Sequence, residues 1–287
     1  MFVEFKEKTF ESYFVSELSR KSKHIYCPDQ TDEKYLGFDA MFYMPYWRHC
    51  FWRFGSHFGA WMQGITARKI NDMGNDFNRV FPDLKANLFF QFKRPEILTT
   101  PRAKEWRHWS GPYFRFSLYP HQHQILTDLS RCTSGNARVL YAAPKLSKTA
   151  DLIKAANDNK IVKKTQVVEA GMLAGHTKCS YSSTSNPALG HSEPEEVGAF
   201  QIEGFIQEMD SLDSQTFTQT TKRLGSNIKK ALAENSEAKH ILNIARSAAT
   251  YGWTDDIPEE FRDTWLDHLI TVHAFSKAFG ITTCLLG

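Results

Sequence analysis

The sequence lacks the features that mark membrane-spanning, secreted and disulfide-bonded proteins. No run approaches the ~20 apolar residues that cross a bilayer, and the most apolar region, 41–62, is interrupted by Arg48, His49, Arg53 and His57. The first residues, MFVEFKEKTFES, carry acids and lack the apolar centre of a secretory signal. The five cysteines are odd in number and form no CxxC pair. We therefore expect a cytoplasmic protein with reduced thiols and no membrane partner.

Two common kinds of ligand site are also missing from the sequence. No GxxxxGK[ST] run is present, which excludes the phosphate-binding loop of one large nucleotide-hydrolase class. His176, Cys179 and His191 have the spacing HxxC followed by a lone histidine, which lacks the paired ligands of a structural zinc site. There is no internal repeat and no low-complexity tract, so the chain is expected to be an ordinary globular protein.

Charge of one sign is unevenly distributed along the 287 residues, although the net charge is only +3. Residues 1–150 contain 22 Lys and Arg against 14 Asp and Glu, whereas the remainder contains 13 against 18. A basic half indicates a polyanionic partner such as nucleic acid when a suitable site accompanies it.

The run FFQFKRP, Phe89 to Pro95, places a lysine inside an apolar strand. Gln91 and Lys93 alternate with Phe90 and Phe92, which predicts a strand on which Gln91 and Lys93 share one face. Burying an ammonium is costly without compensation. Lys93 is therefore expected either at an exposed strand end, paired with Asp39 or Glu96, or beside negative charge in a functional site.

The order of expected elements indicates an α/β fold with a mixed sheet flanked by helices. In the first half we predict a helix, three strands, a helix and a strand, at residues 9–21, 35–44, 87–93, 113–119, 121–132 and 137–144. Residues 176–198 are Ser-, Pro- and Gly-rich and are expected to be irregular. From about 199 to 280 the chain is expected to be helical, with its last helix starting at Pro258. These patterns predict a core at 1–150 with an insertion at about 45–86, and a mainly helical region at 151–287 that packs on or regulates it.

Asp39, in the predicted strand GFDA, together with Q-x-K at 91–93, resembles the PD-(D/E)XK, or restriction-endonuclease-like, nuclease superfamily in its Q-x-K, Mrr-like form. The resemblance covers about residues 9–144. It implies that Asp39 and Gln91 bind Mg²⁺ or Mn²⁺ and that Lys93 assists the attacking water. A glutamate of the first helix, Glu11 or Glu17, would complete the catalytic set, and Glu33 is a third candidate.

One departure from the family pattern concerns the spacing of the motif. Asp39 lies 52 residues before Gln91, so either an insertion separates them or another aspartate takes its place, with Asp72, Asp76 and Asp83 as alternatives. A neutral amide also binds a divalent cation less strongly than a carboxylate does. We therefore expect lower metal affinity than in a site with glutamate at this position.

The connection that follows the motif is basic and contains Trp106 and Trp109. Cations interleaved with aromatic rings can contact phosphates and stack on bases, and we expect the nucleic-acid contacts at Arg94, Arg102, Lys104 and Arg107. The resemblance implies a Mg²⁺-dependent endonuclease that hydrolyses phosphodiester bonds in DNA, an effector of bacterial restriction or anti-phage defence, acting as a homodimer or with a partner defence protein. The alternatives are an RNase and a non-catalytic protein that binds nucleic acid or a partner on the same fold.

Overall fold

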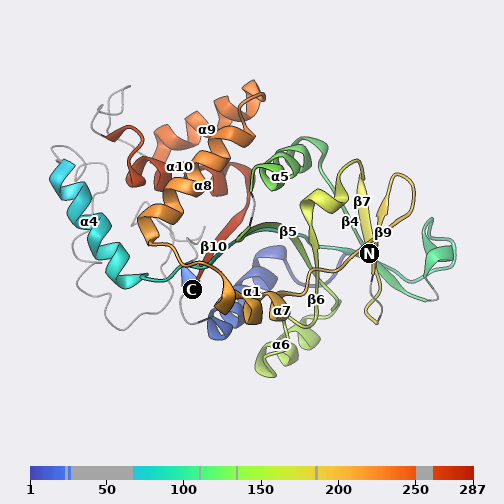
Figure 1. The fold of residues 1–287 in the computed structure, drawn as a ribbon. Coiled ribbons are helices and arrows are strands. Elements are labelled where there is room, and N and C mark those ends of the chain that lie inside the picture. Colours follow the sequence, from blue (N-terminus) through green and yellow to red (C-terminus); the bar gives the residue numbers. More distant parts are fainter. Residues whose placement is uncertain (23–24, 27–66, 110, 134, 185–186, 250–260) are drawn as a thin grey trace. The chain divides into compact units, whose positions relative to one another are not determined.

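The computed structural model shows a mixed α/β protein with two sheets (Figure 1). It describes residues 1–22, 25–26, 67–109, 111–133, 135–184, 187–249 and 261–287. The chain divides into two compact units, Met1–Lys23 with Phe89–Asp210, and His24–Leu88 with Ser211–Gly287. The first unit thus continues past residue 150, and the described part of the expected insertion, 67–86, groups with the C-terminal residues.

The first sheet of the first unit is formed by strands that the sequence mostly predicts. The final residues of β2 (Ala86–Phe92) belong to this unit. Next to β2 in the sheet lies β5 (Ala137–Pro144), and next to β5 lies β6 (Thr165–Glu169). β5 and β6 run antiparallel with Tyr141 opposite Val168. The strands expected at 87–93 and 137–144 are confirmed, whereas β6 was not predicted.

Helices cover both faces of this sheet (Figure 1). On one face, α1 (Glu7–Lys21) packs Phe14 against Phe90 and Phe92, with ring centroids 5.2 and 5.3 Å apart. On the other face, α5 (Pro120–Cys132) places His123 against Tyr141. Both helices confirm their predictions, although α1 begins before Thr9. The remaining helical elements of this unit are α6 (Thr149–Asn157), α7 (Ile202–Glu208), and the short turns η1 (Trp106–His108) and η2 (Ala170–Leu173).

The second sheet is an antiparallel one with an apolar and a polar face. Its order is β3 (Glu96–Leu98), β4 (Tyr113–Ser117), β7 (Lys178–Tyr181), β8 (Ala188–His191) and β9 (Glu195–Val197). β4 confirms the strand expected at 113–119, but it belongs to this sheet and not, as expected, to the one that contains β2 and β5. The expectation that 176–198 is irregular is wrong, because three short strands occupy it.

The second unit is mainly helical, which confirms the character expected for 199–280. Its helices are α4 (Ala67–Val80), α8 (Phe217–Ala231), α9 (Ser236–Ala249) and α10 (Trp265–Phe279), preceded by η3 (Met209–Ser211) at the unit boundary. α10 begins at Trp265, where the Thr264 hydroxyl accepts from the Asp267 N–H, so the start expected at Pro258 is wrong. β1 (Ile25–Tyr26) pairs antiparallel with β10 (Thr282–Leu286).

No helix in the described ranges has both the length and the apolarity needed to cross a bilayer. The strand expected at 35–44, and with it Asp39 and Glu33, lies outside the described residues.

Candidate active site around Lys93

Lys93 directly follows β2 and is buried, with 6% of its surface exposed. All seven residues of β2 are buried. The Lys93 backbone N–H donates to the Ala142 carbonyl at 2.9 Å, so pairing with β5 continues past the end of the strand. The lysine therefore does not occupy an exposed strand end, one of the two positions that the sequence allowed.

A glutamine of α5 joins the two polar residues of the Q-x-K motif. The Lys93 ammonium donates to Gln122 Oε1 at 3.3 Å, and Gln122 Nε2 donates to Gln91 Oε1 at 2.6 Å. Gln91 Nε2 in turn donates to the Phe92 carbonyl at 3.1 Å. Gln122 lies in the first turn of α5, so this helix start sets the positions of both motif side chains.

Two tyrosine rings flank the ammonium of Lys93. Its Nζ lies 5.0 Å from the ring centroid of Tyr119 and 5.5 Å from that of Tyr141, distances at which the ring faces attract a cation. His123 holds the Tyr141 ring in place: the Tyr141 hydroxyl and His123 Nδ1 are 2.9 Å apart, and His123 Nε2 is 2.7 Å from the Leu173 carbonyl. Because a carbonyl can only accept, Nε2 carries the proton and Tyr141 donates to Nδ1.

The site lowers the pKa of Lys93 to about 8, because burial disfavours the charged form more than the negative charge of Glu7 favours it. Glu7 lies in the first turn of α1. Burial raises the pKa of Glu7, and the charge of Lys93 opposes that rise, as does the Arg94 backbone N–H. Lys93 and Glu7 thus form a partly desolvated pair of opposite charge, which supports the second expectation for this lysine.

The glutamates predicted on the first helix occupy two different environments. Glu11 is 8% exposed, lies 2.8 Å from Lys8, and raises the pKa of Glu7 by its negative charge. Glu17 instead accepts the Ile161 backbone N–H at 2.5 Å and lies 3.6 Å from Lys21. The structure therefore places Glu7 near the lysine and Glu11 one turn after Glu7, and it uses Glu17 to hold the connection between α6 and β6.

Sequence reasoning missed Glu7, Gln122, Tyr119 and Tyr141. Glu7 is four residues before Glu11 and shares its helix face, but the expected helix start at Thr9 excluded it. Of the alternatives to Asp39, Asp72 and Asp83 are exposed and Asp76 lies 3.3 Å from Arg79.

The oxygen donors near Lys93 are of the hard type that Mg²⁺ prefers. They include the Glu7 carboxylate and the Gln91 amide oxygen, which at present accepts from Gln122. Within the part of the chain that the structure describes, no three His, Cys, Asp or Glu side chains are grouped closely enough to hold a metal ion. The donor set therefore fits Mg²⁺ in kind, and Asp39 is the residue expected to add a second carboxylate.

The basic connection after β2 is fixed to the outer face of the second sheet. Glu105, 4% exposed, accepts from Tyr113 and from Arg115, both at 2.8 Å, and Trp109 Nε1 donates to Ser180 at 3.0 Å. These hydrogen bonds and the Arg115 charge outweigh burial and lower the pKa of Glu105. Trp109 is thus a buried anchor.

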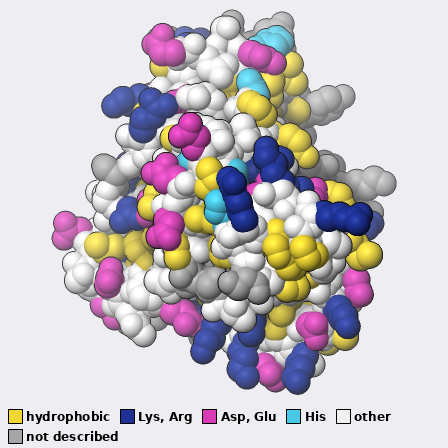
Figure 2. All heavy atoms as spheres, turned by 90° about the vertical axis from the view of Figure 1, so that its right-hand side faces the viewer, with side chains coloured by type: hydrophobic (Ala, Val, Ile, Leu, Met, Phe, Trp, Pro, Cys, Tyr) yellow, Lys and Arg dark blue, Asp and Glu magenta, His cyan; other side chains and the backbone are white. Residues whose placement is uncertain are grey.

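The four cations predicted to contact nucleic acid differ in how they are held. Arg94 donates twice to the Val3 carbonyl, at 3.1 and 2.6 Å, whereas Arg102, Lys104 and Arg107 are exposed. On the face seen in Figure 2, Lys and Arg side chains are interspersed with Asp and Glu. That face therefore carries no single continuous basic surface.

Comparison of the chain with models of protein families, with curated proteins and with solved structures finds no match.

Proposed function

We propose that this protein is a metal-dependent nuclease with a restriction-endonuclease-like core that hydrolyses phosphodiester bonds, with DNA as the substrate. One observation carries the proposal: a buried lysine with a pKa of about 8 ends a central strand, beside Glu7 and hydrogen-bonded through Gln122 to Gln91. Perturbed titratable groups of this kind gather at functional sites. Four elements of the expected order, α1, β2, α5 and β5, support the finer fold, whereas β4 belongs to the second sheet.

The lysine suits proton transfer near neutral pH. With a pKa of about 8, part of the Lys93 population is neutral at pH 7 to 8 and can accept a proton from water. Its charged form stabilises negative charge that develops on a phosphate. Glu7 offsets this charge from one side, while Gln122 and the two tyrosine rings fix the position of Nζ.

Mg²⁺ or Mn²⁺ would be held by Asp39, Gln91 and Glu7, and when bound it would act as a Lewis acid toward a phosphate oxygen. Gln122 has a second role in this proposal, because it must release the Gln91 oxygen to the ion. Arg102, Lys104 and Arg107 would contact the nucleic-acid backbone. A role in restriction or anti-phage defence, as a homodimer or with a partner protein, follows from the resemblance.

One observation favours the alternative of a non-catalytic binding protein. The Gln91 oxygen, a predicted metal ligand, already accepts a hydrogen bond of 2.6 Å from Gln122. In that case Lys93 would be a buried cation held by Glu7, and nucleic acid would bind without being cut.

The test is a cleavage assay on plasmid, linear duplex, single-stranded DNA and RNA, each with Mg²⁺, Mn²⁺ or EDTA. Lys93→Ala and Glu7→Gln are expected to lower cleavage by about a hundredfold or more, the usual size of an acid–base contribution. Glu17→Gln is the matched control, because it makes the same chemical change on the same helix and should leave cleavage per folded molecule near that of the parent.

Other outcomes distinguish the alternatives. Equal loss in Glu7→Gln and Glu17→Gln would remove Glu7 from the site. Cutting of RNA alone would identify an RNase. If the parent cuts nothing but binds DNA, and Lys93→Ala binds it equally well, the protein is a non-catalytic binder.

A further inference from the structure

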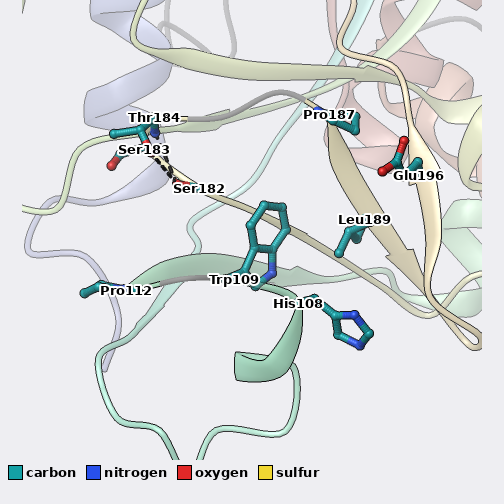
Figure 3. A pocket seen from close by; sticks show the side chains of 10 residues that line it. His108, Trp109, Pro112, Ser182, Ser183, Thr184, Pro187, Leu189 and Glu196 are labelled. Atoms are coloured by element: carbon teal, nitrogen blue, oxygen red, sulfur yellow. Dashed lines mark hydrogen bonds between the residues drawn. The ribbon is translucent and has the colours of Figure 1, made fainter.

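The outer face of the second sheet carries a hollow that is separate from the surroundings of Lys93. Its volume is about 660 Å³, within the range of small-molecule sites. We call it the outer pocket; it is lined by His108, Trp109, Gly111, Pro112, Ser182, Ser183, Thr184, Pro187, Leu189 and Glu196. Figure 3 shows His108 and Trp109 side by side, Leu189 next to them, and Glu196 beyond it.

Strand register explains why this face is polar and open. Arg115, Ser180, Leu189 and Glu196 are opposite one another on four successive strands, so they form one row on the outer face. The neighbouring positions Phe114, Tyr181, Ala188 and Val197 point to the other face and are all buried. The segment before β4 covers the outer face at Glu105 and Trp109, and the outer pocket is the hollow beside it.

Hydrogen bonds hold Trp109, one wall of the outer pocket, in place. Trp109 Nε1 donates to Ser180 Oγ at 3.0 Å, and Ser180 Oγ lies 2.6 Å from His191 Nε2. The indole N–H of Trp109 can only donate, so the Ser180 hydroxyl accepts from it and donates its own proton to His191 Nε2. Trp109 is 8% exposed and Ser180 is fully buried. Trp109 therefore forms a fixed back wall.

The chemistry of the lining indicates what the outer pocket can bind. Among the described residues that line it, the one charged side chain is Glu196, so a phosphate inside it would be repelled. Glu196 and the hydroxyls of Ser182–Thr184 can accept from N–H groups, and Leu189 and the exposed His108 ring offer apolar and aromatic surface. This combination fits a flat, neutral heterocycle with an amino group at its edge.

A cation precedes the outer pocket in the sequence. Arg107, which is exposed, is followed by the lining residue His108, and its Nε donates to His108 Nε2 at 3.2 Å. The other N–H groups of the Arg107 guanidinium can donate to a phosphate. A flat neutral base inside the outer pocket and a phosphate at Arg107 are the two parts of one ligand, a nucleotide.

We propose that the outer pocket binds a nucleobase bearing an exocyclic amino group, through Glu196, with the adjoining phosphate on Arg107. The inference rests on the proposed function in taking nucleic acid as the ligand, and it adds a preference for particular bases at a place other than Lys93. Both a free nucleotide and an unpaired base of a single strand present this chemistry.

The experiment measures binding in EDTA, where no cleavage is expected, to short homopolymers of deoxycytidine and deoxyuridine and to the corresponding monophosphates. Cytosine offers an amino donor where uracil has a carbonyl acceptor, so deoxycytidine should bind at least about tenfold more tightly, as for a site built around one hydrogen-bonding group. Glu196→Ala should bring the two polymers to equal affinity. Arg107→Ala should weaken both polymers alike and lower the salt dependence of binding.

Two control variants distinguish the proposed base contact from a loss of folding and from a general effect of charge. Glu193→Ala removes an exposed carboxylate outside the outer pocket and should keep the preference. Ser183→Trp fills the pocket from an exposed loop position and should abolish the preference. Equal affinity of the parent for the two polymers, or a preference that survives Glu196→Ala and Ser183→Trp, would overturn the proposal.

The two proposals can fail separately. Lys93→Ala should lose cleavage and retain the base preference. Base preference in a parent that cuts nothing supports the outer pocket and contradicts the nuclease, whereas Lys93-dependent cutting without a preference does the opposite. Binding of the monophosphates with the same preference identifies free nucleotides as sufficient ligands; binding of the polymers alone identifies the strand.

Discussion

Lys93 lowers the stability of the fold at the position where we propose that it serves a reaction. Burial lowers its pKa to about 8 from the ordinary lysine value of 10.5. That difference corresponds to about 3 kcal/mol that the charged form costs the folded state. Such a cost is unusual at a position that serves packing alone, because an apolar side chain would fill the space without it.

This cost predicts a stability change with a defined pH dependence. Because the unfolded state binds the proton more tightly, the destabilisation is complete below about pH 8 and disappears as the pH rises through about 10.5. Replacing Lys93 and its partner together, as Lys93→Met with Glu7→Gln, should raise the free energy of unfolding at pH 7 by about 1–3 kcal/mol. Urea denaturation across pH 7 to 10.5 should show this gain shrinking as the pH rises. A gain that stays constant with pH would contradict the assigned pKa.

The sequence predicts the strand residues of the site around Lys93, but it does not predict the partners that lie in the first turns of helices. Alternation along β2 predicts that Gln91 and Lys93 share a face. Both side chains are hydrogen-bonded to Gln122, as this prediction requires. Helix starts are poorly determined by local sequence. In α1 the first turn has no side-chain cap, which hid Glu7, and in α5 the first turn supplies Gln122.

The long elements were predictable and the short ones were not. β2 and β5 have seven and eight residues, enough for a clear apolar pattern. β7, β8 and β9 have four, four and three residues among serines, glycines and prolines, and their apolar face of alternating residues is too short to stand out from turn composition. β7 pairs with β4, which is distant in sequence, and β8 and β9 then add to the sheet in turn.

The β7–β8 hairpin predicts the effect of one methyl group. A Cβ at Gly190 would lie 2.6 Å from the ring of His176. Gly190→Ala should therefore lower the free energy of unfolding by about 1–3 kcal/mol through overpacking. His176→Ala should remove the clash, so the double variant should recover most of the loss relative to His176→Ala alone. A double-mutant cycle by thermal or urea unfolding measures this coupling, and additive effects would contradict the close contact.

At the level of the whole molecule, each compact unit is built from two separate stretches of chain. In the second unit, Phe77 of α4 stacks on Phe217 of α8 with centroids 4.7 Å apart and lies 5.6 Å from Trp265 of α10. Trp265 Nε1 also donates to the Ile70 carbonyl at 3.1 Å. Helices separated by more than 130 residues thus share one aromatic cluster.

Truncating one ring of this aromatic cluster should lower hydrogen-exchange protection within the second unit alone. Phe77→Ala is expected to cost about 2–3 kcal/mol, and hydrogen exchange should show α4, α8 and α10 losing protection together. Backbone amides of β4 and β7, in the first unit, should keep theirs. Equal loss of protection in both units would show that they unfold as a single cooperative body.

The interleaving of the two units also constrains how the protein can be made. A ribosome releases the chain from its N-terminus, and domains fold as their residues emerge. Here α1 must wait for β2, β5 and α6 before its apolar stripe is covered, because the first unit closes only with residues up to Asp210. α4 must wait longer, since the helices that share its aromatic cluster, α8 and α10, begin at Phe217 and Trp265. The Lys93 site is therefore assembled late in synthesis, and a nascent chain would carry it in complete form only after most of the protein has been translated.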